Sequence, residues 1–357
     1  MADYAPLRHL LSDAGYTFVE PPIIHDASVF VDLAGEDLRR RLYLTSDNEG
    51  NELALRPDYT IPVCLRHLAR GAHQRREDYA YLGPVFRQRG AVPGEFLQAG
   101  VESLGRTDRV AADAQLLRLA LDAAACVNIR RPRTMIGDSA IFHAFVDALK
   151  VPKPWHRRLT RMFGDPPRLA EVLETARNGA PAVGEPRLKS ASRARDTAER
   201  MLRESGLATI GGRQADEIAR RYADKAALRT GIGDRAADVL AEYLAIQDEP
   251  EAALTQAQAL ARAHKLDLGT AADRFAKRLE AFDKRGVPMD SVVYAAKFGR
   301  RLDYYTGFNF EIYARLRDAR PTIGGGRYDK LLSMLGAEKA VPAIGFAVWL
   351  ERAAVPA

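Results

Sequence analysis

A long helical block divides this chain into two strand-rich halves. Between about residues 139 and 287, Ala, Arg, Leu and Glu dominate, and apolar residues recur at helical spacing. Runs of β-branched residues, which favour strands, are absent from this block. We therefore expect a core whose first part spans residues 1–138 and whose second part spans residues 288–357, with a mostly helical insertion at residues 139–287.

The composition is that of an ordinary soluble globular protein. The chain has 357 residues, enough for two domains, of which 47% are hydrophobic and 28% are charged. No apolar run is long enough to span a bilayer, and the first residues lack the basic start and apolar core of a signal peptide. Cys64 and Cys126 each lie in an apolar stretch, so we expect buried free thiols in a reducing cytoplasm.

The charge pattern does not demand a nucleic-acid partner. A formal net charge of +6 permits contact with a polyanion, but basic and acidic residues are interspersed along the helical segments. A solvated surface of mixed charge is therefore favoured. The seven histidines are scattered, and no Cys/His pair has the spacing of metal ligands, so the sequence predicts neither a metal site nor a cofactor.

Two consecutive predicted strands, at residues 78–87 and 95–103, provide the first candidate binding surface. Side chains alternate along a strand, so one face of the second strand carries Phe96, Gln98, Gly100 and Glu102. A glutamine and a glutamate that face the same way across a glycine favour the floor of a polar pocket. A solvent-exposed face is the alternative.

A helix predicted to begin at Asp58 supplies a second candidate. It follows two short strands, at residues 42–45 and 53–56, with a polar hairpin loop between them. Asp58 or Thr60 then lies near the positive N-terminal end of the helix.

The third candidate is the segment 298–307, which lies between predicted strands at residues 292–296 and 308–313. It contains two arginines, an aspartate, and the adjacent tyrosines Tyr304 and Tyr305. A tyrosine can line a pocket with its ring and direct its hydroxyl at a polar ligand. The alternative is a hairpin turn with surface tyrosines. Further on, the glycines at 324–326 would let backbone approach a ligand closely, although such a run is often only a flexible turn.

Together and in this order, these segments resemble the catalytic domain of histidyl-tRNA synthetase, a class II aminoacyl-tRNA synthetase. The resemblance covers nearly the whole chain. The string Leu-Asp-Tyr-Tyr-Thr-Gly at residues 302–307 is the most specific motif, and the others lie at residues 55–60, 83–87, 96–102, 324–329 and 345–352.

The resemblance implies an α+β fold in which a six-stranded antiparallel sheet is flanked by helices and carries a helical insertion, usually as a dimer. It also implies a histidine pocket built from the residues that match the family's motif: Asp58, Thr60, Arg87, Gln98, Glu102, Tyr304 and Tyr305. Asp58 would accept from the ammonium group of histidine, while Glu102 and one of the two tyrosines would pair with the imidazole.

Several positions depart from the family's pattern. Arg89 stands where the family has a glutamate, and a guanidinium offers no acceptor to an adenine amine. Arg301 replaces a glycine, and Asp58 replaces a glutamate. The chain ends five residues past Arg352, so we expect no anticodon-binding domain.

This chain keeps the amino-acid pocket of the family but has an altered nucleotide site. In that combination it resembles the regulatory subunits of ATP phosphoribosyltransferase, a family of synthetase paralogues. This resemblance implies a non-catalytic subunit in the first step of histidine biosynthesis. It would form a hetero-oligomer with the short-form catalytic subunit, activate that subunit and transmit inhibition by histidine. We expect a homodimer within this complex, and no tRNA or membrane partner.

Two other functions remain open. Arg87, Arg300 and Arg352 are cations that could hold ATP phosphates, so the chain could be a catalytically active histidine-adenylating or aminoacyl-tRNA synthetase-like paralogue. A tRNA-binding module is the third possibility, suggested by the positive charge and opposed by the interspersed acidic residues.

Overall fold

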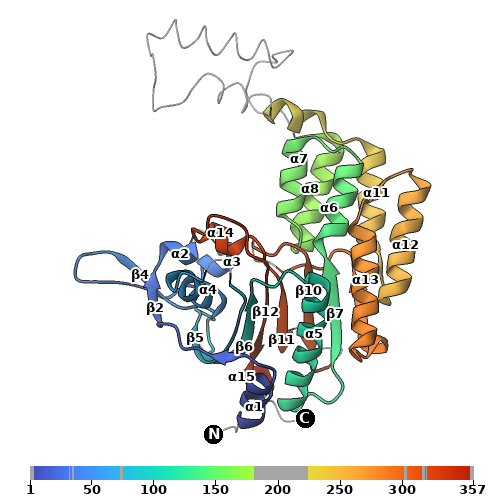
Figure 1. Ribbon diagram of the computed structural model, residues 1–357. Helices are drawn as coiled ribbons and strands as arrows, with labels where there is room; N and C mark the ends of the chain where they lie inside the picture. The colour runs from blue at the N-terminus through green and yellow to red at the C-terminus, as the bar shows by residue number, and fades with distance from the viewer. Residues whose placement is uncertain are drawn as a thin grey trace, which may run out of the picture.

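The computed structural model describes residues 4–31, 33, 36–72, 75–180, 224–300, 304–315, 318 and 320–353. Within these residues, two sheets are formed. The main sheet has the strand order β1-β5-β6-β12-β11-β10-β7-β9-β8, and the smaller sheet has the order β2-β4-β3 (Figure 1).

Six consecutive strands of the main sheet pair antiparallel, as the resemblance to the synthetase family implies. They are β5 (Glu77–Phe86), β6 (Glu95–Leu104), β12 (Ala343–Trp349), β11 (Ile323–Arg327), β10 (Phe308–Tyr313) and β7 (Arg133–Asp138). Parallel strands extend both ends of this set, so the whole sheet is mixed. They are β1 (Thr17–Phe18) beside β5, and β9 (Val292–Ala295) beside β7, with β8 (Gln247–Asp248) at the edge.

The smaller sheet forms a projection at one side of the molecule (Figure 1). It contains the predicted hairpin, as β3 (Leu44–Ser46) and β4 (Glu52–Leu55). Its third strand, β2 (Ile24–Asp26), pairs with the other edge of β4.

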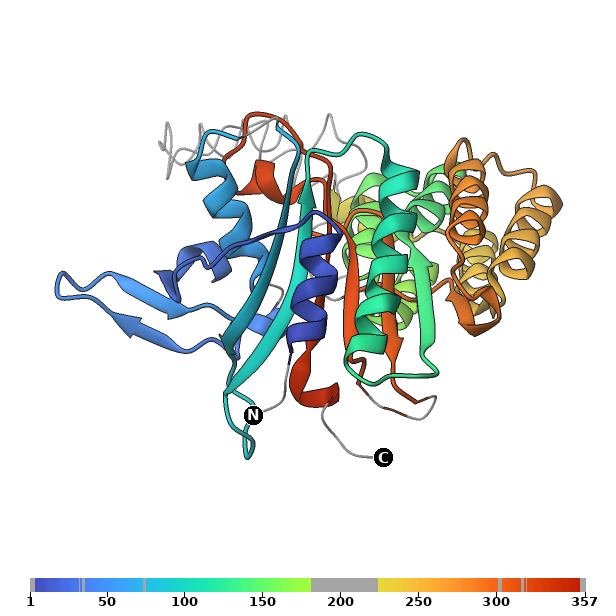
Figure 2. The same cartoon turned by 60° about the horizontal axis from the view of Figure 1, so that its bottom comes forward.

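Helices cover both faces of the main sheet because its strands alternate apolar residues between two cores. On one face, Ala80, Ala99 and Val101 pack against α1 (Ala5–Asp13) and α5 (Arg109–Cys126), which lie side by side in Figure 2. The other core contains Tyr79, Tyr81 and Phe96. The helices on its side are α2 (Ser28–Val31), α3 (Glu36–Arg39), α4 (Thr60–Ala69) and α14 (Leu331–Met334).

The sequence predicts a strongly amphipathic helix at residues 108–127, and this prediction is wrong in one respect. The helix is present as α5, but buried residues lie on more than one of its sides, including Asp113. It is covered by the sheet, by α1 and by α13 (Ala271–Lys284). The side that remains partly exposed is narrow and carries Gln115, Arg118 and Asp122, so the apolar surface covers more of this helix than a simple amphipathic pattern predicts.

The described part of residues 139–287 is helical apart from β8. Its helices gather at the side of the sheet opposite the smaller sheet (Figure 1). They are α6 (Ser139–Ala148), α7 (Lys153–Arg161), α8 (Pro166–Asn178), α11 (Asp234–Ala245), α12 (Pro250–Ala263) and α13, followed by the short 3-10 helix η1 (Met289–Ser291). No helix in the described ranges is long and apolar enough to cross a membrane.

Buried ion pairs join this helical region to the sheet. Arg278 of α13 donates from Nε to Asp113 Oδ2 at 2.8 Å and from Nη1 to Asp138 Oδ2 at 2.6 Å. The other oxygen of Asp113 accepts from Nε of Arg327, in β11, at 3.0 Å. A buried charge stripped of its partner is costly, so these contacts hold α13, α5 and β11 together.

Two alternatives that the sequence left open in the second half are decided by the structure. The glycines at 324–326 form the middle of β11 rather than a flexible turn. The segment after β9 is not a hairpin turn, because β7 lies between β9 and β10 in the sheet. The tyrosine-containing segment therefore crosses from one strand to a non-adjacent one, and Tyr304 and Tyr305 turn inward.

Candidate ligand-binding site

All seven predicted histidine-binding residues line one enclosed space, which we call the buried cavity. Asp58 and Thr60 come from the start of α4, and Arg87 from the end of β5. Gln98 and Glu102 come from β6, and the two tyrosines from the segment before β10. The remaining lining residues are Arg300, Gly324, Tyr328, Gly345, Phe346, Ala347 and Trp349.

Glu102 forms the floor of the buried cavity. Thr60 Oγ1 donates to Oε1 of Glu102 at 2.7 Å, and the Tyr328 hydroxyl donates to Oε2. Burial raises the pKa of Glu102 to about 8, although these hydrogen bonds act in the opposite direction. The carboxyl group is thus positioned to exchange a proton or hydrogen bond with a ligand near neutral pH.

Three tyrosines form the aromatic wall. The ring centroids of Tyr304 and Tyr305 are 5.2 Å apart, and the ring of Tyr328 meets them edge-on at 5.9 and 6.3 Å. Tyr304 and Tyr328 are almost fully buried. Edge-on rings of this kind hold one another in place, so the wall has a fixed shape.

Asp58 is a buried carboxylate beside Arg87. Burial raises the pKa of Asp58, while the charge of Arg87 and the backbone amides of Ile61 and Thr60 lower it. Arg87 is anchored by a hydrogen bond from its Nε to the Pro57 carbonyl oxygen at 2.6 Å. The beginning of α4 and the end of β5 therefore present an acceptor and a donor to the same space.

Polar atoms of both kinds remain unused around the buried cavity. Within the described residues, four lining side chains have buried atoms without a hydrogen-bond partner: Asp58 Oδ1, Gln98 Oε1, Arg300 Nε and Nη1, and Trp349 Nε1. Of these atoms, Arg300 Nη1 forms an ion pair with Glu311 at 3.8 Å. Each such atom costs about 1–3 kcal/mol. A small ligand with both donors and acceptors would satisfy them together.

The buried cavity is closed in this conformation. Its volume is about 20 Å³, which is room for about one water molecule. An amino acid can enter only if lining side chains move apart.

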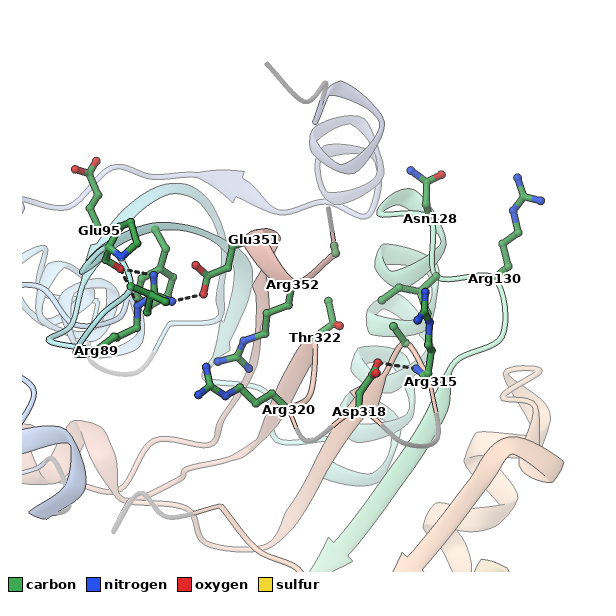
Figure 3. Close-up of a pocket in the computed structure, with 16 residues that line it drawn as sticks. Arg89, Glu95, Asn128, Arg130, Arg315, Asp318, Arg320, Thr322, Glu351 and Arg352 are labelled. Carbon is green, nitrogen blue, oxygen red and sulfur yellow. Dashed lines mark hydrogen bonds and ion pairs between the residues drawn. The ribbon is translucent and has the colours of Figure 1, made fainter. Parts of the chain in front are cut away.

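A second, open space adjoins it, which we call the arginine hollow (Figure 3). It measures about 1020 Å³, and its charged lining residues are Arg89, Glu95, Arg130, Arg315, Asp318, Arg320, Glu351 and Arg352. The Arg89 guanidinium lies 4.2 Å from the centroid of the Phe96 ring and forms an ion pair with Glu351. Its Nε donates to the Pro93 carbonyl oxygen at 2.9 Å, so this side chain covers the aromatic face. Arg301, the other departure near the site, lies outside the described residues.

Sequence reasoning singled out the glycines at 324–326 but did not assign Tyr328, Gly345 or Trp349 to the site. A Cβ atom at Gly345 would overlap the Glu102 carboxylate, and one at Gly324 would overlap the Arg300 guanidinium. These glycines make room for buried charged side chains on adjacent elements. The glycine run at 324–326 was a usable signal. The pairing of Gly345 with Glu102 across β12 and β6 was not, because it joins residues far apart in the sequence.

No group of three or more His, Cys, Asp or Glu side chains in the described residues could hold a metal ion. The site therefore consists of hydrogen-bonding groups, aromatic rings and arginines.

The family model for histidyl-tRNA synthetase matches residues 4–203 and 201–353 of this chain. Solved structures show the same fold. A protein from Bacillus halodurans, described as an ATP phosphoribosyltransferase regulatory subunit/histidyl-tRNA synthetase, aligns with a TM-score of 0.65 and 22% identity, covering 99% of this chain and 80% of that one. A histidine–tRNA ligase subunit from Alicyclobacillus acidocaldarius aligns with a TM-score of 0.60 and 24% identity, covering 98% and 90%. The predicted class II synthetase-like fold is confirmed.

Curated relatives are more similar in sequence. The ATP phosphoribosyltransferase regulatory subunit of Chelativorans sp. (strain BNC1) is 41% identical over 98% of this chain and 96% of its own length. The protein of the same name from Agrobacterium fabrum is 42% identical over 94% of this chain and 91% of its own length. The chain therefore belongs to the histidyl-tRNA synthetase family and, within it, to the ATP phosphoribosyltransferase regulatory subunits.

Proposed function

We propose that this chain is the histidine-sensing regulatory subunit of an ATP phosphoribosyltransferase. In this role it binds a short-form catalytic subunit, activates it, and transmits inhibition by histidine in the first step of histidine biosynthesis. Relatives with the regulatory-subunit name match nearly the whole chain. The observation that supports histidine as the effector is the convergence of all seven predicted residues on one cavity with unused donors and acceptors.

The chemistry of the buried cavity suits the three polar groups of histidine. Asp58, with Oδ1 unused, would accept from the ammonium group. Arg300, whose Nε and Nη1 make no hydrogen bond, would donate to the carboxylate. Glu102, with its pKa near 8, would pair with the imidazole, whose own pKa lies close to neutral.

The closed state of the cavity supplies a basis for regulation. A ligand shifts an equilibrium only if it binds two states unequally. A space of about 20 Å³ excludes histidine, so histidine would favour a conformation in which the aromatic wall and Glu102 are further apart. The catalytic subunit would sense that difference.

We further propose that the chain does not activate histidine with ATP. Arg89 covers Phe96 and pairs with Glu351, so the protein's own guanidinium occupies the face on which a purine would stack. The complex would work in the cytoplasm, with a homodimer of this chain and without tRNA, a membrane or a cofactor.

The test combines the purified chain with a short-form catalytic subunit. We expect the chain to raise phosphoribosyl transfer and histidine to suppress it. Calorimetry with the chain alone should show histidine binding. Activation without histidine binding would place the effector site elsewhere, and the absence of any activation would refute the proposal.

The alternative is an active adenylating paralogue, favoured by the three arginines near the cavity. Arg87 and Arg300 line it, and Arg352 stacks on the Trp349 ring, its guanidinium carbon 4.4 Å from the ring centroid. Histidine-dependent exchange of pyrophosphate with ATP distinguishes the two functions. Robust exchange would establish the enzyme, whereas its absence in a chain that binds histidine supports the sensor.

A further inference from the structure

The short segment at residues 298–300 carries Arg300 into the buried cavity. It follows β9, and the backbone amide of Phe298 donates to the Ala295 carbonyl oxygen at 2.9 Å. Arg300, at the end of the segment, lines the cavity. The path of this backbone therefore determines where the Arg300 guanidinium lies.

Glycines bring this segment into close contact with other elements on both of its sides. On the side of the sheet, a Cβ atom at Gly137 of β7 would overlap the Phe298 carbonyl oxygen. On the other side, a Cβ atom at Gly164 would lie 2.9 Å from the carbonyl carbon of Gly299, and one at Gly299 would lie 2.8 Å from Cε1 of Phe163. Backbones approach this closely only where side chains are missing. The segment is thus held between β7 and the turn that connects α7 to α8.

The turn between α7 and α8 is itself fixed by the helical region. The ring of Phe163 stacks on that of Phe142 in α6, with centroids 5.0 Å apart, and Phe142 is fully buried. The Asp165 backbone amide donates to the Met162 carbonyl oxygen at 3.0 Å. Gly164 has a φ of +89°, which residues with a Cβ atom rarely adopt. The turn is therefore a firm support for the segment.

The Arg300 guanidinium is only loosely held at its own end. Among the described residues, its Nε and Nη1 have no hydrogen-bond partner, and its ion pair with Glu311 is long, at 3.8 Å. Its other contacts are with aromatic rings, whose centroids lie 5.4 Å away for Trp349 and 5.5 Å away for Tyr305. A side chain without short hydrogen bonds takes its position from its backbone, and here that backbone rests on Phe163 and Gly164.

We propose that the turn between α7 and α8 is a positioning element for ligand binding, in which Phe163 and Gly164 hold Arg300 where it can bind the carboxylate of the ligand. This inference rests on the proposed function, in which that ligand is histidine. A movement of the helical region then changes histidine affinity. By linkage, bound histidine changes the position of the turn to the same energetic extent.

A measurement without ligand tests the first step, the support of Arg300 by the turn. The chain has two tryptophans, Trp155 and Trp349, so fluorinated tryptophan gives two fluorine NMR signals, which Trp155→Phe assigns. Arg300→Ala defines how the Trp349 signal shifts when the guanidinium leaves the ring. We expect Gly164→Ala to shift the Trp349 signal in the same direction. Gly233→Ala is the matched control, because it places a Cβ atom at a φ of +79° with nothing within 4 Å, and it should leave the signal in place.

Ligand selectivity tests the second step, and calorimetry of the full chain measures it. Histidinamide lacks the negative charge that Arg300 would bind. Phe163→Leu should therefore lower histidine affinity about tenfold and change histidinamide affinity less than about twofold. The control is Phe145→Leu, which alters another ring of the helical region, 4.5 Å from the Tyr243 ring centroid, and should leave both affinities unchanged. Phe163→Leu should also shift the Trp349 signal, so the test does not depend on the folding of one variant.

Three results would overturn this inference. They are an unchanged Trp349 signal in both Gly164→Ala and Phe163→Leu, equal losses of histidine and histidinamide affinity in Phe163→Leu, and a full further loss when Phe163→Leu is added to Arg300→Ala. The two proposals can fail separately. If the wild-type chain does not bind histidine, the proposed function fails, whereas the Trp349 signal still decides whether the turn positions Arg300.

Discussion

The buried cavity and the arginine hollow meet where Arg352, which lines the hollow, stacks on Trp349, which lines the cavity. The two spaces differ in volume and in exposure to solvent. The buried cavity is lined by buried and partly buried side chains, has a volume of about 20 Å³ and contains a carboxyl group whose pKa is raised to about 8. The hollow measures about 1020 Å³, and its arginines Arg130, Arg315 and Arg320 are exposed to solvent. In the first space a missing hydrogen bond is costly, whereas in the second water screens most charges.

This difference in exposure indicates which of the two spaces can discriminate between ligands. A dry cavity with unused donors and acceptors discriminates strongly between ligands, because any unmatched group stays unpaired. A solvent-exposed hollow lined by arginines attracts anions with little dependence on their shape. Substitutions should therefore have large effects in the buried cavity and small ones in the hollow.

The largest effect should come from the pH dependence of stability. Glu102 has a pKa of about 8 in the folded state, above its value in an unfolded chain, so folding favours the protonated form. The stability that protonated Glu102 gives the folded state is fully present below about pH 4.5. It is lost as the pH rises through 8, so the free energy of unfolding falls by up to roughly 4 kcal/mol.

Glu102→Gln should therefore flatten the fall in unfolding free energy between pH 5 and pH 8.5, measured by urea denaturation. The matched control is Glu95→Gln, an exposed glutamate on the same strand beside the hollow, which should retain the wild-type fall. Identical curves for wild type and Glu102→Gln would show that the cavity is not dry.

The second prediction concerns the close approach of β12 to β6. A Cβ atom at Gly345 would lie 2.6 Å from the Val101 carbonyl oxygen and would overlap the Glu102 carboxylate. Gly345→Ala should thus weaken histidine binding more than about 100-fold, or about 3 kcal/mol.

Gly307→Ala provides the control, because its nearest neighbour would be Arg327 Cδ at 3.8 Å. This variant should bind histidine as wild type does in calorimetry. Normal binding by Gly345→Ala would mean that Glu102 is not part of the histidine site.

A smaller effect is expected from Tyr328→Phe. This change removes the hydroxyl that donates to Glu102 Oε2 and leaves a buried acceptor unpaired. Histidine affinity should fall about tenfold, or 1–2 kcal/mol. Tyr243→Phe removes a buried hydroxyl that shares a hydrogen bond with Tyr294 in the other core, and calorimetry should show no change. Equal losses in both variants would argue against a specific role for Tyr328.

The smallest effect should follow from Arg89→Ala. Arg89 lines the hollow, pairs with Glu351 and does not line the buried cavity. Histidine affinity should change less than about twofold, or about 0.4 kcal/mol, because the lost contacts lie outside the buried cavity. If Arg89→Ala lost as much histidine affinity as Tyr328→Phe, the buried cavity and the hollow would have to be regarded as one binding site.

Local pattern predicted much of the fold. The hairpin of β5 and β6 was placed within a residue or two, and the strand at residues 308–313 was placed fully, because alternation and glycine- or proline-rich turns are local signals. Burial on more than one side of α5 was not predictable, since it depends on α1 and α13 packing around it. For the glycines of β11, local pattern left a close backbone approach and a flexible turn both open, because their lack of side chains makes room for neighbours across the sheet.

The candidate site was predicted through family resemblance more than through pattern. Spacing alone placed Gln98 and Glu102 on one face, and they do share the cavity floor. It could not reveal that Tyr328 donates to Glu102 across 226 residues of chain, or that Arg89 folds onto Phe96. Such contacts depend on which strands become neighbours.

The ion pairs of Arg278 have a mechanical consequence. One guanidinium bridges the carboxylates of Asp113 and Asp138 with little access to water, and Asp113 also engages Arg327. Withdrawing α13 by even part of a turn would strand several charges at once. Helix α13 therefore cannot separate gradually from α5 and from the sheet. We expect these elements to unfold together in one cooperative transition.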